Sequence, residues 1–263
     1  MARRYNLGAN AFFLVCFSLL LPVQLFLGIK HKSWGFMVGM VCGLILEILG
    51  YAARMGLSKG VDLFLMYIVT LTIGPAFLSA AIYLCLARII PVYGQHLARF
   101  RPVVYTTIFI LLDFFALLLQ SAGGALVGGD DATMWATGLS ILKAGLSIHL
   151  VGIVVYSYLC FDFAFQVVRN RSKWQSRFAP LQASSRFRRF CSCLAISTLA
   201  ILIRTAFRVA ELSKGFHSKI AESEPAFLVL DGTMILIACL CLTAYHPGPS
   251  FEGYWPEANF SLK

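Results

Sequence analysis

Charged residues are scarce in this sequence of 263 residues, because only 13% of them are Asp, Glu, Lys or Arg. An ordinary soluble domain has about 25% charged and about 45–50% apolar residues, whereas 59% of this chain is hydrophobic. This deficit excludes a mainly soluble protein and indicates an integral membrane protein. Acids are the scarcest charged residues, and the net charge is +10. In a membrane protein such an excess is typical of basic cytoplasmic loops, so we expect no nucleic-acid partner.

The sequence also lacks the short motifs of common enzymes and nucleotide-binding proteins. It contains no G-x-x-x-x-G-K-[ST] phosphate loop, so pumping driven directly by ATP within this chain is not expected. It contains no H-E-x-x-H and no paired metal-ligand spacing, and its G-x-S-x-G match, Gly56-Leu57-Ser58-Lys59-Gly60, follows an apolar run of helical length rather than a strand. We therefore predict no enzyme activity, no catalytic residues, no metal and no cofactor.

Long apolar runs fill the chain instead. A helix needs about 17–25 residues to cross a bilayer, and seven runs are long enough. They cover approximately residues 11–29, 36–57, 62–88, 102–127, 136–160, 190–211 and 225–245. The sequence therefore predicts an all-α fold, a bundle of seven transmembrane helices forming a single domain over residues 1–263. The first run exceeds the apolar core of a usual signal peptide, so we expect it to remain a spanning helix.

The distribution of Lys and Arg predicts the orientation of this bundle. With the N-terminus outside and the C-terminus inside, the inside segments carry most of the 22 basic residues. The most basic of them is the stretch from Arg169 to Arg189, which either only fixes the topology or also contacts anionic lipids of the inner leaflet. Arg3 and Arg4 oppose this orientation, because they lie before the first run.

The sixth run carries charge in an unusual pattern. Arg204, Arg208 and Glu211 have the i, i+4 and i+7 spacing that places side chains on one helical face. Each charge near the bilayer centre costs about 2.5–3.5 kcal/mol on insertion scales, so the two arginines need partners. Other runs supply acids for them.

Polar residues in the other runs complete the candidate site. Glu47 and Arg54 are seven residues apart in the second run, and Asp113 and Gln120 are seven apart in the fourth. Intramembrane ionisable groups are functional candidates by default. The predicted substrate-binding residues are Glu47, Arg54, Asp113, Gln120, Arg204, Arg208, Glu211 and Asp231. We expect them to form one polar network on the outer side of the membrane, which either binds a polar head group or only holds the helices together.

Several motifs, in order from about residue 36 to residue 248, resemble one family. They are Glu47-x-x-Gly50-Tyr51-x-x-Arg54, Pro75 with Ala80-Ala81-x-Tyr83, Asp113, Gln120-x-x-Gly123-Gly124, Gly145-Leu146, Arg204-x-x-x-Arg208-x-x-Glu211-x-x-x-Gly215, Glu224, Asp231 and His246-Pro247-Gly248. This pattern is similar to the fungal lipid-translocating exporters, which include sphingoid long-chain-base and aminocholesterol resistance proteins. Two positions depart from it: His149 stands where a glutamine is expected, and Gly232-Thr233 where bulkier residues are expected. From the residues alone, we expect His149 to be a hydrogen-bonded core residue rather than a proton carrier.

The resemblance implies seven transmembrane helices, an outside N-terminus, a fungal source and a role in moving or tolerating amphiphilic lipids. Our first hypothesis is a plasma-membrane protein that translocates or exports lipids such as sphingoid long-chain bases and confers resistance to toxic lipids or drugs. Its partners would be membrane lipids and an amphiphilic lipid substrate. Two alternatives are a seven-helix lipid or stress sensor that does not transport, and a scaffold for other lipid-handling proteins. The oligomeric state, the energy source and the direction of transport stay open at this point.

Overall fold

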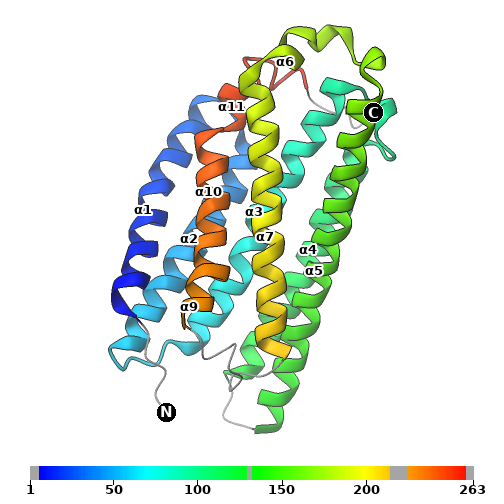
Figure 1. The fold of residues 1–263 in the computed structure, drawn as a ribbon. Helices are drawn as coiled ribbons and strands as arrows, with labels where there is room; N and C mark the ends of the chain where they lie inside the picture. The colour runs from blue at the N-terminus through cyan, green and yellow to red at the C-terminus, as the bar shows by residue number, and fades with distance from the viewer. Residues whose placement is uncertain (1–5, 129–131, 214–223, 259–263) are drawn as a thin grey trace.

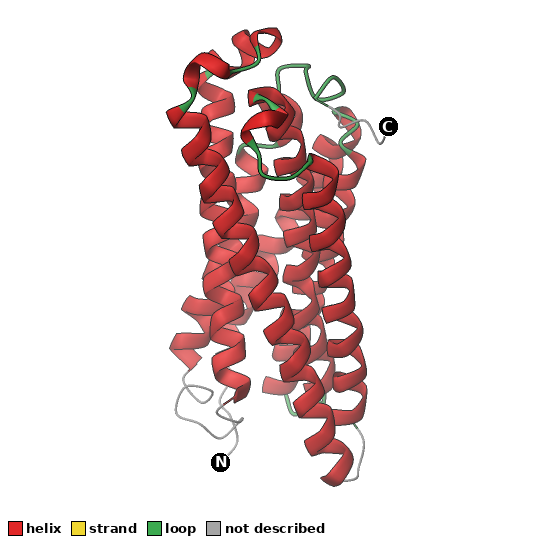
Figure 2. Cartoon of the chain, turned by 90° about the vertical axis from the view of Figure 1, so that its right-hand side faces the viewer, coloured by secondary structure: helices red, strands yellow, loops and turns green. Residues whose placement is uncertain are grey.

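The computed structural model describes residues 6–128, 132–213 and 224–258. Within these ranges the chain is helical and contains no strand, and Figure 2 shows its loops gathered at the two ends of a bundle. The long helices are α1 (Leu7–Lys30), α2 (Trp34–Ser58), α3 (Phe64–Tyr93), α4 (Pro102–Val127), α5 (Ala132–Arg169), α7 (Ser185–Ser213) and α10 (Met234–Ala244). The short helices are α6 (Ala179–Ala183), α9 (Glu224–Phe227) and α11 (Pro247–Ser250).

Within the described residues, seven helical segments are long and apolar enough to cross a membrane. The seventh is composite: α9, a π-helical turn at Leu228–Thr233 and α10 follow one another without a break. Large apolar side chains point away from the bundle, such as Leu19, Phe114 and Phe161, which are 66%, 57% and 72% exposed. An apolar outer surface of this extent would be a liability in water but is what a lipid environment requires. The protein is therefore a multi-pass integral membrane protein.

The helices follow one another around a ring (Figure 1). Successive contacts run from α1 to α2, α3, α4, α5, α7 and α10, and α10 contacts α1 again. α3 also touches α7 across the ring, and 72% of its most apolar stretch is buried, against 22% for α1. α3 is therefore the central helix, and it contributes to every polar site described below.

Glycines allow α4 and α5 to pack closely. A Cβ atom at Gly123 would lie 2.7 Å from the carbonyl oxygen of Gly138, and one at Gly138 would lie 2.7 Å from that of Gly123. Small residues at such contacts let transmembrane helices approach one another. This contact explains the glycine motif after Gln120.

Several helices extend beyond the apolar runs in the sequence. α3 continues to Tyr93 rather than residue 88, α5 continues to Arg169 rather than 160, and α7 begins at Ser185 rather than 190. α5 is about 57 Å long at 1.5 Å per residue, well beyond the roughly 30 Å hydrocarbon core. The apolar pattern marks only the part of a helix in lipid, whereas helical hydrogen bonding continues into the aqueous region.

Candidate functional site

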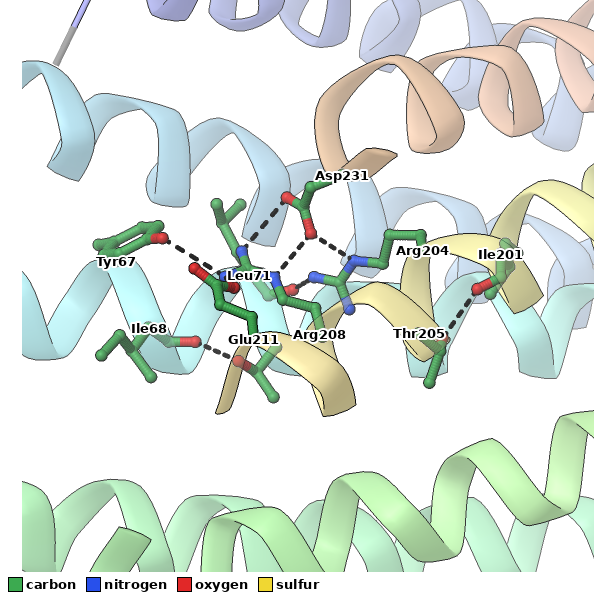
Figure 3. A network of polar contacts seen from close by, with 10 residues as sticks. Tyr67, Ile68, Leu71, Ile201, Arg204, Thr205, Arg208, Glu211 and Asp231 are labelled. Carbon is green, nitrogen blue, oxygen red and sulfur yellow. Dashed lines mark hydrogen bonds and ion pairs between the residues drawn. The ribbon is translucent and has the colours of Figure 1, made fainter. Parts of the chain in front are cut away.

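The first polar site lies between α3, α7 and the π-helical turn, and we call it the arginine cluster (Figure 3). Arg208 binds Asp231 through two contacts, Nε to Oδ1 at 2.7 Å and Nη2 to Oδ2 at 3.2 Å. Arg204 Nε lies 2.9 Å from the same Oδ1 atom, and Arg204 also donates to the Leu71 carbonyl oxygen. Arg208 Nη1 pairs with Glu211 at 3.0 Å. One carboxylate, that of Asp231, thus pairs with two buried guanidinium groups, and Arg208 has Glu211 as a second acidic partner.

Asp231 lies within the π-helical turn. π-helical turns insert an extra residue into a helix and often lie at functional sites. Next to Asp231, a Cβ atom at Gly232 would lie 2.5 Å from the Tyr51 hydroxyl and 2.8 Å from the Phe13 ring. The small residue at 232, a departure from the family pattern, therefore lets these two rings pack beside Asp231.

Arg54 lies at the edge of this cluster. Its Nε donates to Asn10 Oδ1 at 2.8 Å, and its Nη2 lies 3.8 Å from Glu224. The guanidinium stacks 3.7 Å from the Phe227 ring centre and 5.0 Å from that of Tyr67. Arg208 faces the same two rings. The rings thus lie between the two cations and provide cation–π stabilisation.

Glu47 is fully buried at the α3 side of the cluster, where its charged neighbours are Arg204, Asp231 and Arg208. Neither of its carboxylate oxygens makes a hydrogen bond within the described ranges. Oε1 packs against Gly74, where an added Cβ atom would lie 2.9 Å away. Glu47 therefore interacts with the arginines through longer-range electrostatics.

A second polar site lies between α3, α4 and α5, and we call it the Asp–His cluster. Asp113 Oδ1 lies 2.8 Å from His149 Nδ1, and both side chains are buried. Asp113 Oδ2, His149 Nε2 and both amide atoms of Gln120 have no hydrogen-bond partner among the residues that the structure describes. The Tyr83 hydroxyl lies near Asp113, also without a hydrogen bond of ordinary geometry there. Unsatisfied buried polar atoms are costly, so this cluster is a candidate place for a polar ligand.

A groove of about 370 Å³ between α3 and α4 reaches Asp113. Its other walls are almost entirely apolar, and they include Ala76 and Phe77 of α3 and Phe114 and Leu118 of α4. Phe114 and Leu118 are exposed on the lipid-facing side of α4. An acid thus borders an apolar groove that opens toward the membrane.

The structure brings together only part of the residues predicted from the sequence. Glu47, Arg54, Arg204, Arg208, Glu211 and Asp231 lie in or beside the arginine cluster. Asp113 and Gln120 do not join it, because α4 turns that face toward α5. The expected single network is therefore two separate clusters.

Some residues of these clusters were not predicted from the sequence. The contribution of Tyr67 and Phe227 was missed, because aromatic residues in apolar runs carry no distinctive signal. His149 was expected to be hydrogen-bonded, which its contact with Asp113 confirms. Its pairing with Asp113 had no signal in the sequence, because it depends on how α4 and α5 face each other. No group of three or more potential metal ligands occurs in the described part of the chain.

A ring of membrane-spanning helices with buried charges on its inner faces defines the class: a polytopic membrane protein with an intramembrane polar site. A family model described as "RTA1 like protein" matches residues 40–254. The chain belongs to this RTA1-like family, which confirms the resemblance found in the sequence.

Three curated relatives from Saccharomyces cerevisiae illustrate the family. The chain is 30% identical to a protein named sphingoid long-chain base transporter RSB1, over 94% of this chain and 73% of the relative. It is 27% identical to protein RTA1 over 85% and 69%. It is 28% identical to protoporphyrin uptake protein 1 over 76% and 65%. No solved structure matches the chain.

Proposed function

We propose that this protein translocates or exports amphiphilic lipids with a cationic head group, such as sphingoid long-chain bases. The observation that carries the proposal is the groove between α3 and α4, in which Asp113 borders a surface that is apolar apart from Ser121. The name of the relative RSB1, a sphingoid long-chain base transporter, supports the same substrate class. Export of such lipids would confer resistance to their toxic effects.

In this proposal Asp113 receives the protonated amine while the hydrocarbon chain stays in the groove. Oδ1 is held by His149 at 2.8 Å, and Oδ2 has no partner within the described residues. A charge-assisted hydrogen bond to that oxygen would contribute about 1.5–3 kcal/mol. The arginine cluster is a weaker candidate for an amine, because the Asp231 and Glu211 carboxylates already bind guanidinium groups.

The cellular setting belongs to the same proposal. The excess of Lys and Arg in the predicted inside loops supports an outside N-terminus and an inside C-terminus. The fungal relatives support a multi-pass protein of the fungal plasma membrane. We propose that the chain acts as one seven-helix domain and as a translocator rather than an enzyme.

Flux of a fluorescent sphingoid base in proteoliposomes tests this function. We expect protein-dependent flux from the wild type and a reduction of about 10- to 100-fold in Asp113→Asn, because the amine loses a charged acceptor. Asp162→Asn is the matched control, since Asp162 pairs with Arg99 away from the groove, and we expect it to keep wild-type flux.

Two outcomes would contradict the proposal. Equal flux in Asp113→Asn and the wild type would exclude Asp113 as the amine acceptor. Specific binding of the lipid without any flux in folded wild-type protein would favour the lipid-sensor alternative.

A further inference from the structure

A second groove lies on the opposite side of α3, between α5 and α7. It has a volume of about 430 Å³, and its walls are mostly apolar side chains of α3, α5 and α7. On α7 it extends from Cys191 to Leu202, which is about 17 Å of helix. This length is close to half of the roughly 30 Å hydrocarbon core, the depth of the acyl chains of one leaflet.

A polar hollow continues this groove at the end of the bundle that holds α6. The two share Tyr93, Val167 and Val168, and the hollow adds Arg171 and Arg188. Both arginines are exposed, and neither forms an ion pair with a carboxylate in the part of the chain that the structure describes. The groove therefore has an apolar body and a positively charged mouth.

Hydrogen bonds hold this mouth in place. Gln182 Nε2 donates to the carbonyl oxygens of Val92 at 2.8 Å and Gln175 at 2.9 Å. Trp174 Nε1 donates to the Val167 carbonyl at 2.9 Å, and its ring packs edge-on against Tyr93 at 5.0 Å. Arg188 Nη2 donates to the Ala183 carbonyl at 2.8 Å. The connection after α5 is thus fixed to the end of α3, so the hollow is formed without a ligand.

We propose that this groove binds an anionic phospholipid from the adjacent leaflet. One acyl chain lies between α5 and α7, and the phosphate binds Arg171 and Arg188. Guanidinium groups suit phosphate oxygens because they offer parallel N–H donors, and basic pockets between transmembrane helices bind anionic lipid heads. The same two arginines would repel the ammonium group of a sphingoid base. This site therefore differs from the groove at Asp113 in charge preference as well as position, and it does not depend on the transport proposal.

Native mass spectrometry of the purified full-length protein tests this site. Phosphatidylserine and phosphatidylcholine of equal chain length serve as probes. We expect phosphatidylserine to bind the wild type more tightly. The Arg171→Gln/Arg188→Gln variant should bind phosphatidylserine about 30-fold more weakly than the wild type. Each basic residue near an anionic lipid contributes about a factor of five to the affinity, and the variant lacks two of them. Arg101→Gln, an exposed arginine outside the groove, should bind as the wild type does.

A change in the groove body tests the acyl-chain part separately. Ala195 is exposed and lines the groove, so Ala195→Phe should fill it without disturbing the core. We expect this variant to bind both lipids weakly while its elution and melting stay those of the wild type. Undiminished phosphatidylserine binding by the double-arginine variant would overturn the proposal. Equal competition by soluble glycerophosphoserine would overturn it too, since the acyl chain would then contribute nothing to the binding affinity.

Discussion

The two polar clusters inside the bundle differ in how their carboxylates are paired. In the arginine cluster, Asp231 and Glu211 make ion pairs of 2.7–3.0 Å with Arg204 and Arg208. In the Asp–His cluster, one contact of 2.8 Å joins Asp113 to His149, and several buried polar atoms lack partners within the described residues. Unbonded buried atoms occur in both clusters, Glu47 Oε1 and Oε2 among them, so the difference lies in the ion pairs. Those of the arginine cluster stabilise the helix packing, whereas Asp113 Oδ2 has no partner within the described residues and can bind a ligand.

The two clusters also differ in how open their surroundings are. The arginine cluster lies between α3, α7 and the π-helical turn (Figure 3), and the rings of Tyr67 and Phe227 lie beside Arg208. Asp113 borders a groove that opens toward lipid. We infer that charge content alone does not identify the binding site in this membrane protein. The unsatisfied groups next to an opening are the better guide.

The largest effect on stability is expected from Arg208→Ala. This change removes the guanidinium group that Asp231 and Glu211 share and leaves Asp231 with Arg204 alone. Removing one partner of a buried pair costs about 3–5 kcal/mol. Thermal or denaturant unfolding in detergent measures it. Arg99→Ala is the matched control, because Arg99 pairs with Asp162 while its side chain is 55% exposed, so its loss should cost about 0–1 kcal/mol. Similar destabilisation by both variants would contradict a structural role specific to the arginine cluster.

An intermediate effect is expected at His149. His149→Leu removes the hydrogen bond to Asp113 Oδ1, and leaving a buried acceptor unsatisfied costs about 1–3 kcal/mol. His149→Gln, the residue expected from the family pattern, keeps a donor and should restore most of this loss. Thermal or denaturant unfolding of both variants and the wild type in the same detergent measures these differences in stability. If His149→Leu were as stable as the wild type, the Asp–His contact would not stabilise the bundle.

The sequence predicted the helices and the arginine face well, because both depend on local periodicity. Arg204, Arg208 and Glu211 share one side of α7, as their spacing required. The separation of Asp113 from this face could not be predicted. It depends on how α4 is rotated in the ring, which is set by close packing at Gly123 and Gly138 rather than by its own pattern. The π-helical turn at Asp231 was missed for a similar reason, since it shifts the register of an ordinary apolar run.

The smallest effect on stability is expected from Glu47→Gln, although the sequence placed Glu47 on a par with Asp113. Its carboxylate makes no hydrogen bond within the described ranges. Glutamine keeps the size of the side chain and breaks no hydrogen bond, so the free energy of unfolding should change by about 1 kcal/mol or less. Flux of a sphingoid base should stay near the wild-type value, in contrast to Asp113→Asn. Loss of flux in Glu47→Gln together with normal flux in Asp113→Asn would show that transport needs Glu47 and not Asp113. The lipid path would then run through the arginine cluster, and its ion pairs would have to open during transport.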